Sequence, residues 1–141
     1  MSWNYQGREL TEDEILKYPA FVYLITNKIT GRKYIGKKLT TRTGYKTVNG
    51  KRKKIRLPSD YMVYYGSNEE LKGDVKQLGS ENFEREILRF CNNKSEATYY
   101  ELKYQILHEV LESDNYYNSW IMARVRKSNL KNLNESTRKD T

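Results

Sequence analysis

Tyrosine phenols and glutamate carboxylates can take part in acid–base or metal-assisted hydrolysis, and Tyr23, Tyr34 and Glu101 are three such residues. Tyr23 and Tyr34 lie on neighbouring predicted strands, which can bring both phenol groups to one edge of a sheet. Glu101 lies in a predicted helix, and a lone carboxylate there suits Mg²⁺, which fills its other positions with water and phosphate. Each residue also has an ordinary interpretation, because strand tyrosines usually pack and helix glutamates usually face solvent.

Cysteine and histidine each occur once, as Cys91 and His108. Within this chain the counts exclude a disulfide, a structural zinc site and a zinc hydrolase centre. Cys91 ends the apolar run EILRFC, so we expect a small buried residue rather than a nucleophile. His108 is about 10.5 Å beyond Glu101 along a helix, too far for both to bind one metal. We expect His108 to be structural or exposed.

Positive charge is concentrated in one stretch of the chain. The formal net charge is +8, and no acidic residue occurs from Ile15 through Ser59. The basic residues of this stretch are Lys17, Lys28, Arg32, Lys33, Lys37, Lys38, Arg42, Lys46, Lys51, Arg52, Lys53, Lys54 and Arg56. Such a field repels itself unless a polyanion neutralises it, and nucleic-acid phosphates are the commonest such partner. A surface kept only for solubility normally mixes both signs.

Three segments have the composition of β-strands. AFVYLIT (20–26) is rich in β-branched and aromatic residues, and RKYIG (32–36) follows a loop, so the pair predicts an antiparallel hairpin. A third strand is expected over 83–90. The basic stretch 37–60 is expected to form an exposed β-ribbon or loop, because Asn49-Gly50 is a strong hairpin signal.

Helices are expected between these strands. Thr11 and Glu14 have capping-box spacing and predict a short helix, and Ser67 and Glu70 predict the start of a second. A third helix is expected over 93–112. The order of elements predicts an α+β fold, a small three-stranded antiparallel sheet flanked by helices.

Several motifs resemble those of the GIY-YIG nuclease superfamily. FVY (21–23) and YIG (34–36) resemble the two halves of the family signature, although phenylalanine stands where the first half has glycine. YYGS (64–67), Glu101 in YYELKYQ and Asn118 in NYYNSW follow in the family's order. In particular, the chain resembles the small phage-encoded members of the homing-endonuclease type.

The resemblance implies the same α+β fold and a divalent-metal-dependent endonuclease that hydrolyses DNA phosphodiester bonds. Glu101 would hold Mg²⁺ (or Mn²⁺), and Tyr23 and Tyr34 would line the site, with one phenol helping to activate water. Asn118 would hydrogen-bond the metal shell or hold a neighbouring loop; a plain turn residue is the alternative.

The family also uses an arginine on the helix after YIG, and here that region is replaced by the basic insertion. Arg42 lies closest to the expected spacing, with Lys37, Lys38 and Arg56 as rivals. Tyr65 stands where some members carry a histidine, and a packing role is the equal alternative.

Double-stranded DNA is the expected partner, with an oligomer or an accessory specificity protein as further possibilities. The expected DNA-binding residues are Lys37, Lys38, Lys51, Arg52, Lys53, Lys54, Arg56, Arg124, Arg126 and Lys127. Two alternatives stay open: a catalytically silent nucleic-acid-binding module of the same fold, and a small structural or regulatory protein whose basic surface meets an acidic protein partner.

The predicted organisation is an N-terminal helical extension (1–19), a nuclease domain (20–120) and a basic C-terminal tail (121–141), disordered over 134–141. No apolar run reaches the ~18 residues of a membrane span. No export signal is present at the N-terminus. A cytoplasmic location is therefore expected, in the host if the protein is phage-encoded.

Overall fold

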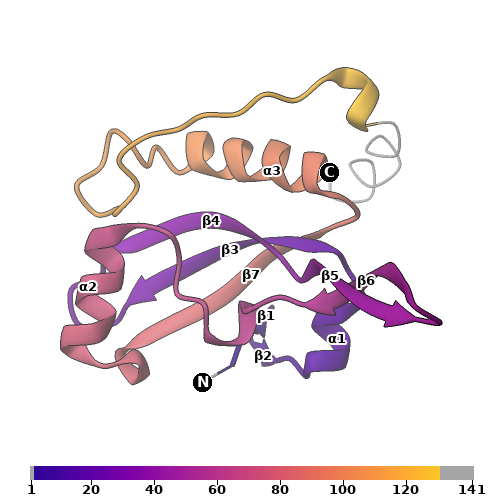
Figure 1. Ribbon diagram of the computed structural model, residues 1–141. Coiled ribbons are helices and arrows are strands. Elements are labelled where there is room, and N and C mark those ends of the chain that lie inside the picture. The colour runs from indigo at the N-terminus through magenta and orange to yellow at the C-terminus, as the bar shows by residue number, and fades with distance from the viewer. Residues whose placement is uncertain (1, 131–141) are drawn as a thin grey trace.

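A mixed β-sheet lies at the centre of the protein, whose computed structural model describes residues 2–130 (Figure 1). Within these residues the sheet has five strands in the order β2-β1-β7-β3-β4. They are β1 (Asn4–Tyr5), β2 (Arg8–Glu9), β3 (Ala20–Asn27), β4 (Lys33–Leu39) and β7 (Phe83–Cys91). A separate sheet consists of β5 (Thr41–Val48) and β6 (Lys51–Pro58). The helices are α1 (Glu12–Leu16), α2 (Glu69–Leu78) and α3 (Lys94–Leu107), with 3-10 helices at Tyr61–Val63, Ser80–Asn82 and Lys127–Leu130.

The central strands confirm the predicted antiparallel pairing, but the sheet is larger than predicted. β3 pairs antiparallel with β4 on one side and with β7 on the other. β1 adds a parallel pairing to β7, with Asn4 opposite Glu86, and β2 folds back on β1. Two-residue strands are too short to show alternation, so only a helix was expected in 1–19. The buried Trp3 anchors this segment by donating a hydrogen bond to the Tyr61 carbonyl oxygen at 2.7 Å.

Alternation along β3 gives each face of the sheet its own core. Phe21 and Tyr23 point to the face covered by α1 and α2, where the ring centroids of Trp3 and Phe21 are 4.9 Å apart. Ala20 and Val22 point to the opposite face, which α3 covers (Figure 1). The sheet is therefore flanked by helices on both faces, in agreement with the predicted α+β class.

Helix α1 begins as predicted, and α2 begins slightly later. Thr11 caps α1, and the Glu14 side chain accepts from the Thr11 N–H, which confirms the capping box. The N-cap of α2 is Asn68 rather than Ser67, because Asn68 Oδ1 accepts from the Leu71 N–H at 2.9 Å. The Ser67 hydroxyl is left free for a contact described below.

Helix α3 is shorter than the predicted 93–112. Its start is confirmed by Asn93, whose side chain accepts from the Glu96 N–H at 2.8 Å. The helix ends at Leu107 because Glu109 takes a positive φ of 52°, which a continuing helix cannot accommodate. The chain then turns back along α3 as an extended segment (Figure 1).

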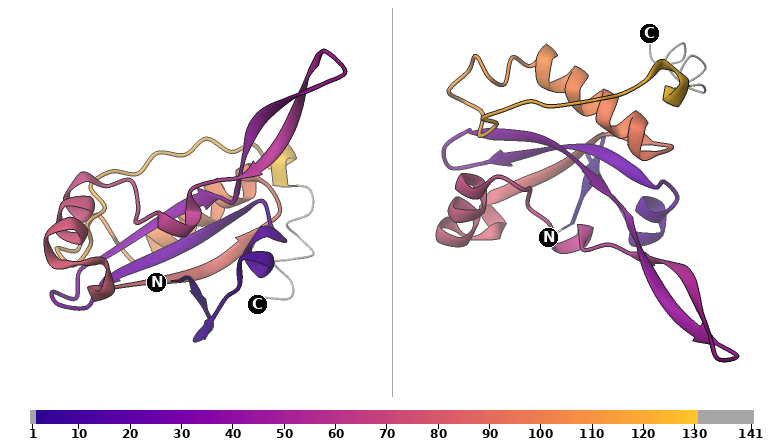
Figure 2. Two further views of the ribbon diagram at one scale, coloured as in Figure 1. Left: turned by 60° about the horizontal axis from the view of Figure 1, so that its bottom comes forward. Right: turned by 45° about the horizontal axis from the view of Figure 1, so that its top comes forward.

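The β5–β6 hairpin, called the ribbon (41–58), projects from the body of the protein (Figure 2). Its turn is Asn49-Gly50, with φ values of 52° and 75°, which confirms the predicted hairpin. Lys37 and Lys38, predicted within the same insertion, instead belong to β4.

The predicted C-terminal tail is described only in part. Residues 121–130 run from the body to the last 3-10 helix, and residues 131–141, including the stretch predicted to be disordered, lie outside the described residues. A search of the helices in 2–130 finds none with the length and apolarity needed to cross a membrane.

Candidate active site

A cavity of about 350 Å³ lies beside the edge strand β4. Its walls come from β4, from the segment before α2, from α3 and from the extended segment after α3. The polar lining residues include Tyr34, Lys37, Ser67, Glu101, Gln105 and Asn118. Three predicted site residues that are far apart in the sequence, Tyr34, Glu101 and Asn118, are thus brought together.

Lys37 is the cation that faces Glu101. Lys37 Nζ lies 3.9 Å from Glu101 Oε1 and donates a hydrogen bond to Thr98 Oγ1 at 2.7 Å. The pairing follows from the fold, because Ile35 and Lys37 lie on the face of β4 that packs against α3. Lys38 points to the other face, where its Nζ lies 4.1 Å above the Tyr64 ring.

The Glu101 carboxylate is partly desolvated and only loosely paired. Its side chain is 18% exposed, and burial raises its pKa above the usual value, an effect that the nearby Lys37 partly offsets. A carboxylate held in this way would gain from a further cation, since a second positive charge would offset more of the cost of desolvation.

Tyr34 reaches the same cavity from β4. Its hydroxyl lies 3.0 Å from Ser67 Oγ. Gly66, at a positive φ of 91°, packs on the ring, because a Cβ added there would lie 3.3 Å from Tyr34 Cδ2. Burial raises the pKa of Tyr34, whereas the hydrogen bond to Ser67 lowers it. Tyr34 is therefore a neutral phenol at neutral pH, hydrogen-bonded to the Ser67 hydroxyl.

Tyr23 lies beneath this surface rather than on it. Its side chain is fully buried, and its partner across the β3–β4 ladder is Gly36. A Cβ on Gly36 would lie 2.4 Å from Tyr23 Oη, so the glycine of the YIG motif gives the ring the space it occupies. Burial, followed by the phenols of Tyr64 and Tyr34, raises the pKa of Tyr23 well above 10. Tyr23 therefore keeps its proton.

Asn118 protects the open edge of β4. Its Nδ2 donates to the Ile35 carbonyl oxygen at 2.8 Å, and its Oδ1 accepts from the Ile35 N–H at 3.1 Å. Gln105 from α3 also donates to the Ile35 carbonyl oxygen, at 3.0 Å. The amide of Asn118 is thus committed to the backbone of the motif, which is a positioning role.

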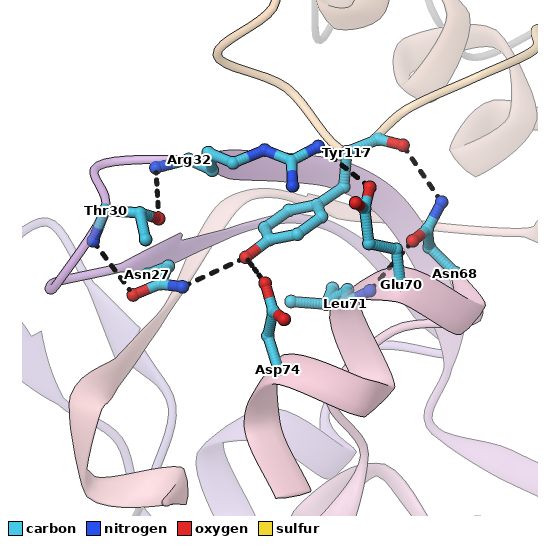
Figure 3. Close-up of polar contacts among 8 residues, drawn as sticks. All are labelled: Asn27, Thr30, Arg32, Asn68, Glu70, Leu71, Asp74 and Tyr117. Carbon is cyan, nitrogen blue, oxygen red and sulfur yellow. Dashed lines mark hydrogen bonds and ion pairs between the residues drawn. The ribbon is translucent and has the colours of Figure 1, made fainter. Parts of the chain in front are cut away.

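Tyr117 anchors the segment that carries Asn118 (Figure 3). Its hydroxyl donates to Asp74 Oδ2 at 2.6 Å and accepts from Asn27 Nδ2 at 3.0 Å. Asn68, the cap of α2, donates from Nδ2 to the Tyr117 carbonyl oxygen at 2.9 Å. Sequence reasoning missed this clamp, because its partners come from β3 and from α2 with its cap, both far from Tyr117 in the sequence.

Two predicted site residues lie elsewhere. Tyr65 packs against Arg85, whose Cζ is 4.3 Å from the Tyr65 ring centroid. Its neighbour Tyr64 turns toward Tyr23 instead, with ring centroids 5.9 Å apart. Arg42 is the second residue of β5, at the base of the ribbon.

Cations continue from the cavity toward the ribbon. Lys37, Lys38, Arg42 and Lys94 line a neighbouring cavity of about 450 Å³. The remaining predicted DNA-binding residues are all exposed, on β6 and in the segment after α3: Lys51, Arg52, Lys53, Lys54, Arg56, Arg124, Arg126 and Lys127.

Glu101 is the metal-ligand candidate in this cavity. Within 2–130 no group of three or more His, Cys, Asp or Glu side chains could hold a metal ion. Cys91 is buried, as predicted, and burial raises the pKa of its thiol to about 12. His108 is exposed, as predicted, with Nδ1 3.4 Å from the Tyr116 hydroxyl.

The chain is similar to known proteins of one family. Residues 3–121 match a family model described as "Putative endonuclease segE, GIY-YIG domain". The protein named "Putative endonuclease segE" of Enterobacteria phage T4 is 36% identical over 98 residues, which are 70% of this chain and 39% of that protein. The chain thus spans less than half of the relative's length, and no solved structure gives a significant match. Because the family model covers most of the sequence, the chain belongs to the GIY-YIG family in its segE group.

Proposed function

We propose that this protein is a divalent-metal-dependent endonuclease that hydrolyses phosphodiester bonds of double-stranded DNA. The central support is the meeting of Glu101, Lys37 and Tyr34 in one cavity, where the carboxylate is desolvated and its nearest cation is 3.9 Å away. The names of the family and of the phage relative support the same reaction class. The proposal extends to a homing-type enzyme that acts in the cytoplasm of an infected host, since the relative is a phage protein.

The donor set fits Mg²⁺ (or Mn²⁺). One carboxylate, Glu101, is available in the cavity, and hard cations of this type use one or two protein carboxylates together with water and substrate phosphate. Bound there, Mg²⁺ would polarise the scissile phosphate and stabilise the leaving oxygen.

Lys37 supplies the positive charge that the resemblance assigns to an arginine. Its hydrogen bond to Thr98 directs Nζ into the cavity beside Glu101, where it can offset the charge that develops on the phosphate. Arg42 lies one cavity farther along β4–β5, so a contact with a neighbouring phosphate suits it better.

Tyr34 is the phenol placed to exchange a proton with water in the cavity. Its raised pKa means that Tyr34 loses its proton only when positive charge is close, and Lys37 and a bound cation would supply that charge. Tyr23 is a positioning residue that supports Tyr34 from below, with ring centroids 6.2 Å apart.

Incubation of the purified protein with supercoiled plasmid and Mg²⁺ tests this function. Wild-type protein should nick or linearise the plasmid, whereas EDTA or Glu101→Gln should abolish cleavage without abolishing DNA binding. Glu69→Gln is the matched control, because the Glu69 side chain is 90% exposed on α2. Retained binding with no cleavage of plasmid or phage genomic DNA by wild-type protein, under any divalent metal, would favour the silent binding module.

A further inference from the structure

The ribbon leaves the body of the protein at a firmly held junction. Thr40 is buried, and its Oγ1 donates to the Tyr18 carbonyl oxygen at 2.6 Å. At the return, the Ser59 N–H donates to the Thr40 carbonyl oxygen at 2.8 Å, and the Ser59 hydroxyl donates to the Leu39 carbonyl oxygen at 2.6 Å. The ribbon therefore extends in a defined direction from the strand that carries Lys37 (Figure 2).

The cations of the ribbon have no carboxylate partner. They are Arg42, Lys46, Lys51, Arg52, Lys53, Lys54 and Arg56. Among residues 2–130, no Asp or Glu oxygen lies within ion-pair distance of any of them. Lys46 and Lys53 even stand directly opposite each other in the ladder. Like charges placed in this way destabilise a hairpin, so the arrangement favours a polyanionic partner.

The two faces of the ribbon differ in chemistry. Strand alternation and the register place four hydroxyl groups on one face, called the hydroxyl face, together with three cations: Thr41, Thr43, Tyr45, Thr47, Arg52, Lys54 and Arg56. Arg52 Cζ lies 3.9 Å above the Tyr45 ring, which confirms that these side chains share a face. The opposite face, called the lysine face, carries Arg42, Lys46, Lys51 and Lys53 with the half-buried Ile55 and Leu57 at its base.

We infer that the ribbon enters the major groove of duplex DNA with its hydroxyl face toward the base edges, and so selects the site that this protein cuts. The inference rests on the function proposed above and adds the element that provides specificity. A two-stranded ribbon fits the ~12 Å wide major groove. Arginine reads guanine through two hydrogen bonds, and threonine offers both a hydroxyl and a methyl group that contacts thymine. The lysine face, which offers mainly point charges, suits phosphates.

The length of the ribbon sets the reach of this recognition. Each strand has eight residues. At about 3.4 Å per residue each strand is about 27 Å long, a length that corresponds to about eight base pairs. Arg42, at the base of the ribbon, and Lys38, on β4, line a cavity that Lys37 shares with the Glu101 cavity, so one DNA backbone can follow cations from the groove to the site. The cut should therefore fall at a constant offset from the preferred sequence.

Selection from a random duplex pool separates sequence reading from charge. We would compare Arg52→Ala/Arg56→Ala on the hydroxyl face with Lys46→Ala/Lys53→Ala on the lysine face, both in a Glu101→Gln background without metal. Each pair removes two positive charges from exposed positions. The first pair should lower the ratio of preferred to random binding by about tenfold or more. The second pair should keep the preference and weaken binding to all duplexes alike. It should also reduce the slope of log affinity against log salt concentration by about two.

Three results would overturn the inference: wild-type binding without preference, equal loss of preference in both pairs, or equal binding of double-stranded RNA. Equal binding of double-stranded RNA would do so because the major groove of A-form RNA is too narrow for side chains to read, so the ribbon could not be entering it. Thermal unfolding of each variant checks that its fold is intact. Plasmid cleavage with Mg²⁺ is measured separately on the protein with Glu101 intact. If the ribbon does not read sequence, the plasmid is still nicked; if the proposed nuclease function is wrong, it is not.

Discussion

The cavity beside β4 and the ribbon that directly follows β4 in the sequence differ in solvent exposure and in how their side chains are held. The cavity is half-buried, and several of its polar side chains are held by hydrogen bonds, as Tyr34 is by Ser67 and Lys37 by Thr98. The ribbon is exposed, and it is held by its own ladder and by the junction at Thr40. Hydrolysis needs desolvated groups in fixed positions, whereas contact with a polyanion needs charge at the surface.

Removing one lysine from each region should give effects of different kinds. Lys37→Ala should reduce kcat by about a hundredfold, because the charge lies in the partly desolvated cavity, and should change DNA affinity little. Lys53→Ala should weaken DNA binding several-fold and leave kcat unchanged, because the charge is exposed on the ribbon. Single-turnover cleavage at saturating protein measures the rate of the chemical step, and DNA binding without metal measures the affinity. A loss of kcat in both variants would break the contrast.

Glycines in the two regions should differ in their contribution to stability. Gly36→Ala places a methyl group 2.4 Å from Tyr23 Oη in the core, and should destabilise the protein by about 1–3 kcal/mol. A Cβ at Gly50 would meet no atom within 4 Å, so the cost of Gly50→Ala comes from the positive φ of 75°. This strain should destabilise the ribbon by about 1–2 kcal/mol.

Urea unfolding followed by tryptophan fluorescence measures the first change, because Trp3 lies in the same core as Tyr23. Hydrogen exchange of the β5–β6 amides measures the second. If Gly50→Ala lowers global stability as much as Gly36→Ala does, the ribbon unfolds together with the body of the protein and the contrast between the two regions fails.

Much of the fold followed from local patterns, and the limits of that reasoning are physical. The strand FVY, the Thr11 capping box and the Asn49-Gly50 turn were predictable because alternation, capping and positive φ depend on nearby residues. The parallel pairing of β1 with β7 could not be predicted, because a strand of two residues shows no alternation of apolar and polar residues.

Side-chain direction limited the prediction of the site. Lys37 and Lys38 are adjacent in β4 and point to opposite faces, and only the packing of α3 decides that Lys37 meets Glu101. Side-chain direction was equally unpredictable for two neighbouring tyrosines. Tyr64 points toward Tyr23, whereas Tyr65, the residue predicted for the site, packs against Arg85. Glu101 and Asn118 were selected by resemblance, because neither residue type at its spacing indicates a cavity.

The clamp around Tyr117 offers a smaller test of the fixed geometry of the cavity. Tyr117→Phe removes the hydroxyl shared by Asp74 and Asn27, and should destabilise the protein by about 1–2 kcal/mol because both partners lose a hydrogen bond. It should also lower kcat, since Asn118 is the next residue. Tyr116→Phe is the matched control, because its hydroxyl has only a long contact with the exposed His108. Equal effects on cleavage in the two variants would remove the positioning role of the segment.

The smallest expected effect concerns the cost of keeping Glu101 ionised. Its pKa is raised in the folded protein, so the folded state binds that proton more tightly than the unfolded chain does. The resulting stabilisation is complete below the ordinary glutamate pKa of 4.5 and is lost as the pH rises through the raised value. Glu101→Gln, which is neutral at every pH, should therefore gain in Tm relative to wild-type protein as the pH rises across this range.

Thermal unfolding of the two proteins with and without Mg²⁺ over this pH range provides the measurement. A bound cation would favour the ionised carboxylate, so Mg²⁺ should narrow the difference by stabilising wild-type protein alone. In the ribbon, Lys53→Ala should give a difference in Tm that stays constant over the same pH range, because no carboxylate of residues 2–130 lies within ion-pair distance of Lys53. If Glu101→Gln is no more stable than wild-type protein at neutral pH, the carboxylate is better solvated than its burial indicates, and its readiness to accept a metal loses its physical basis.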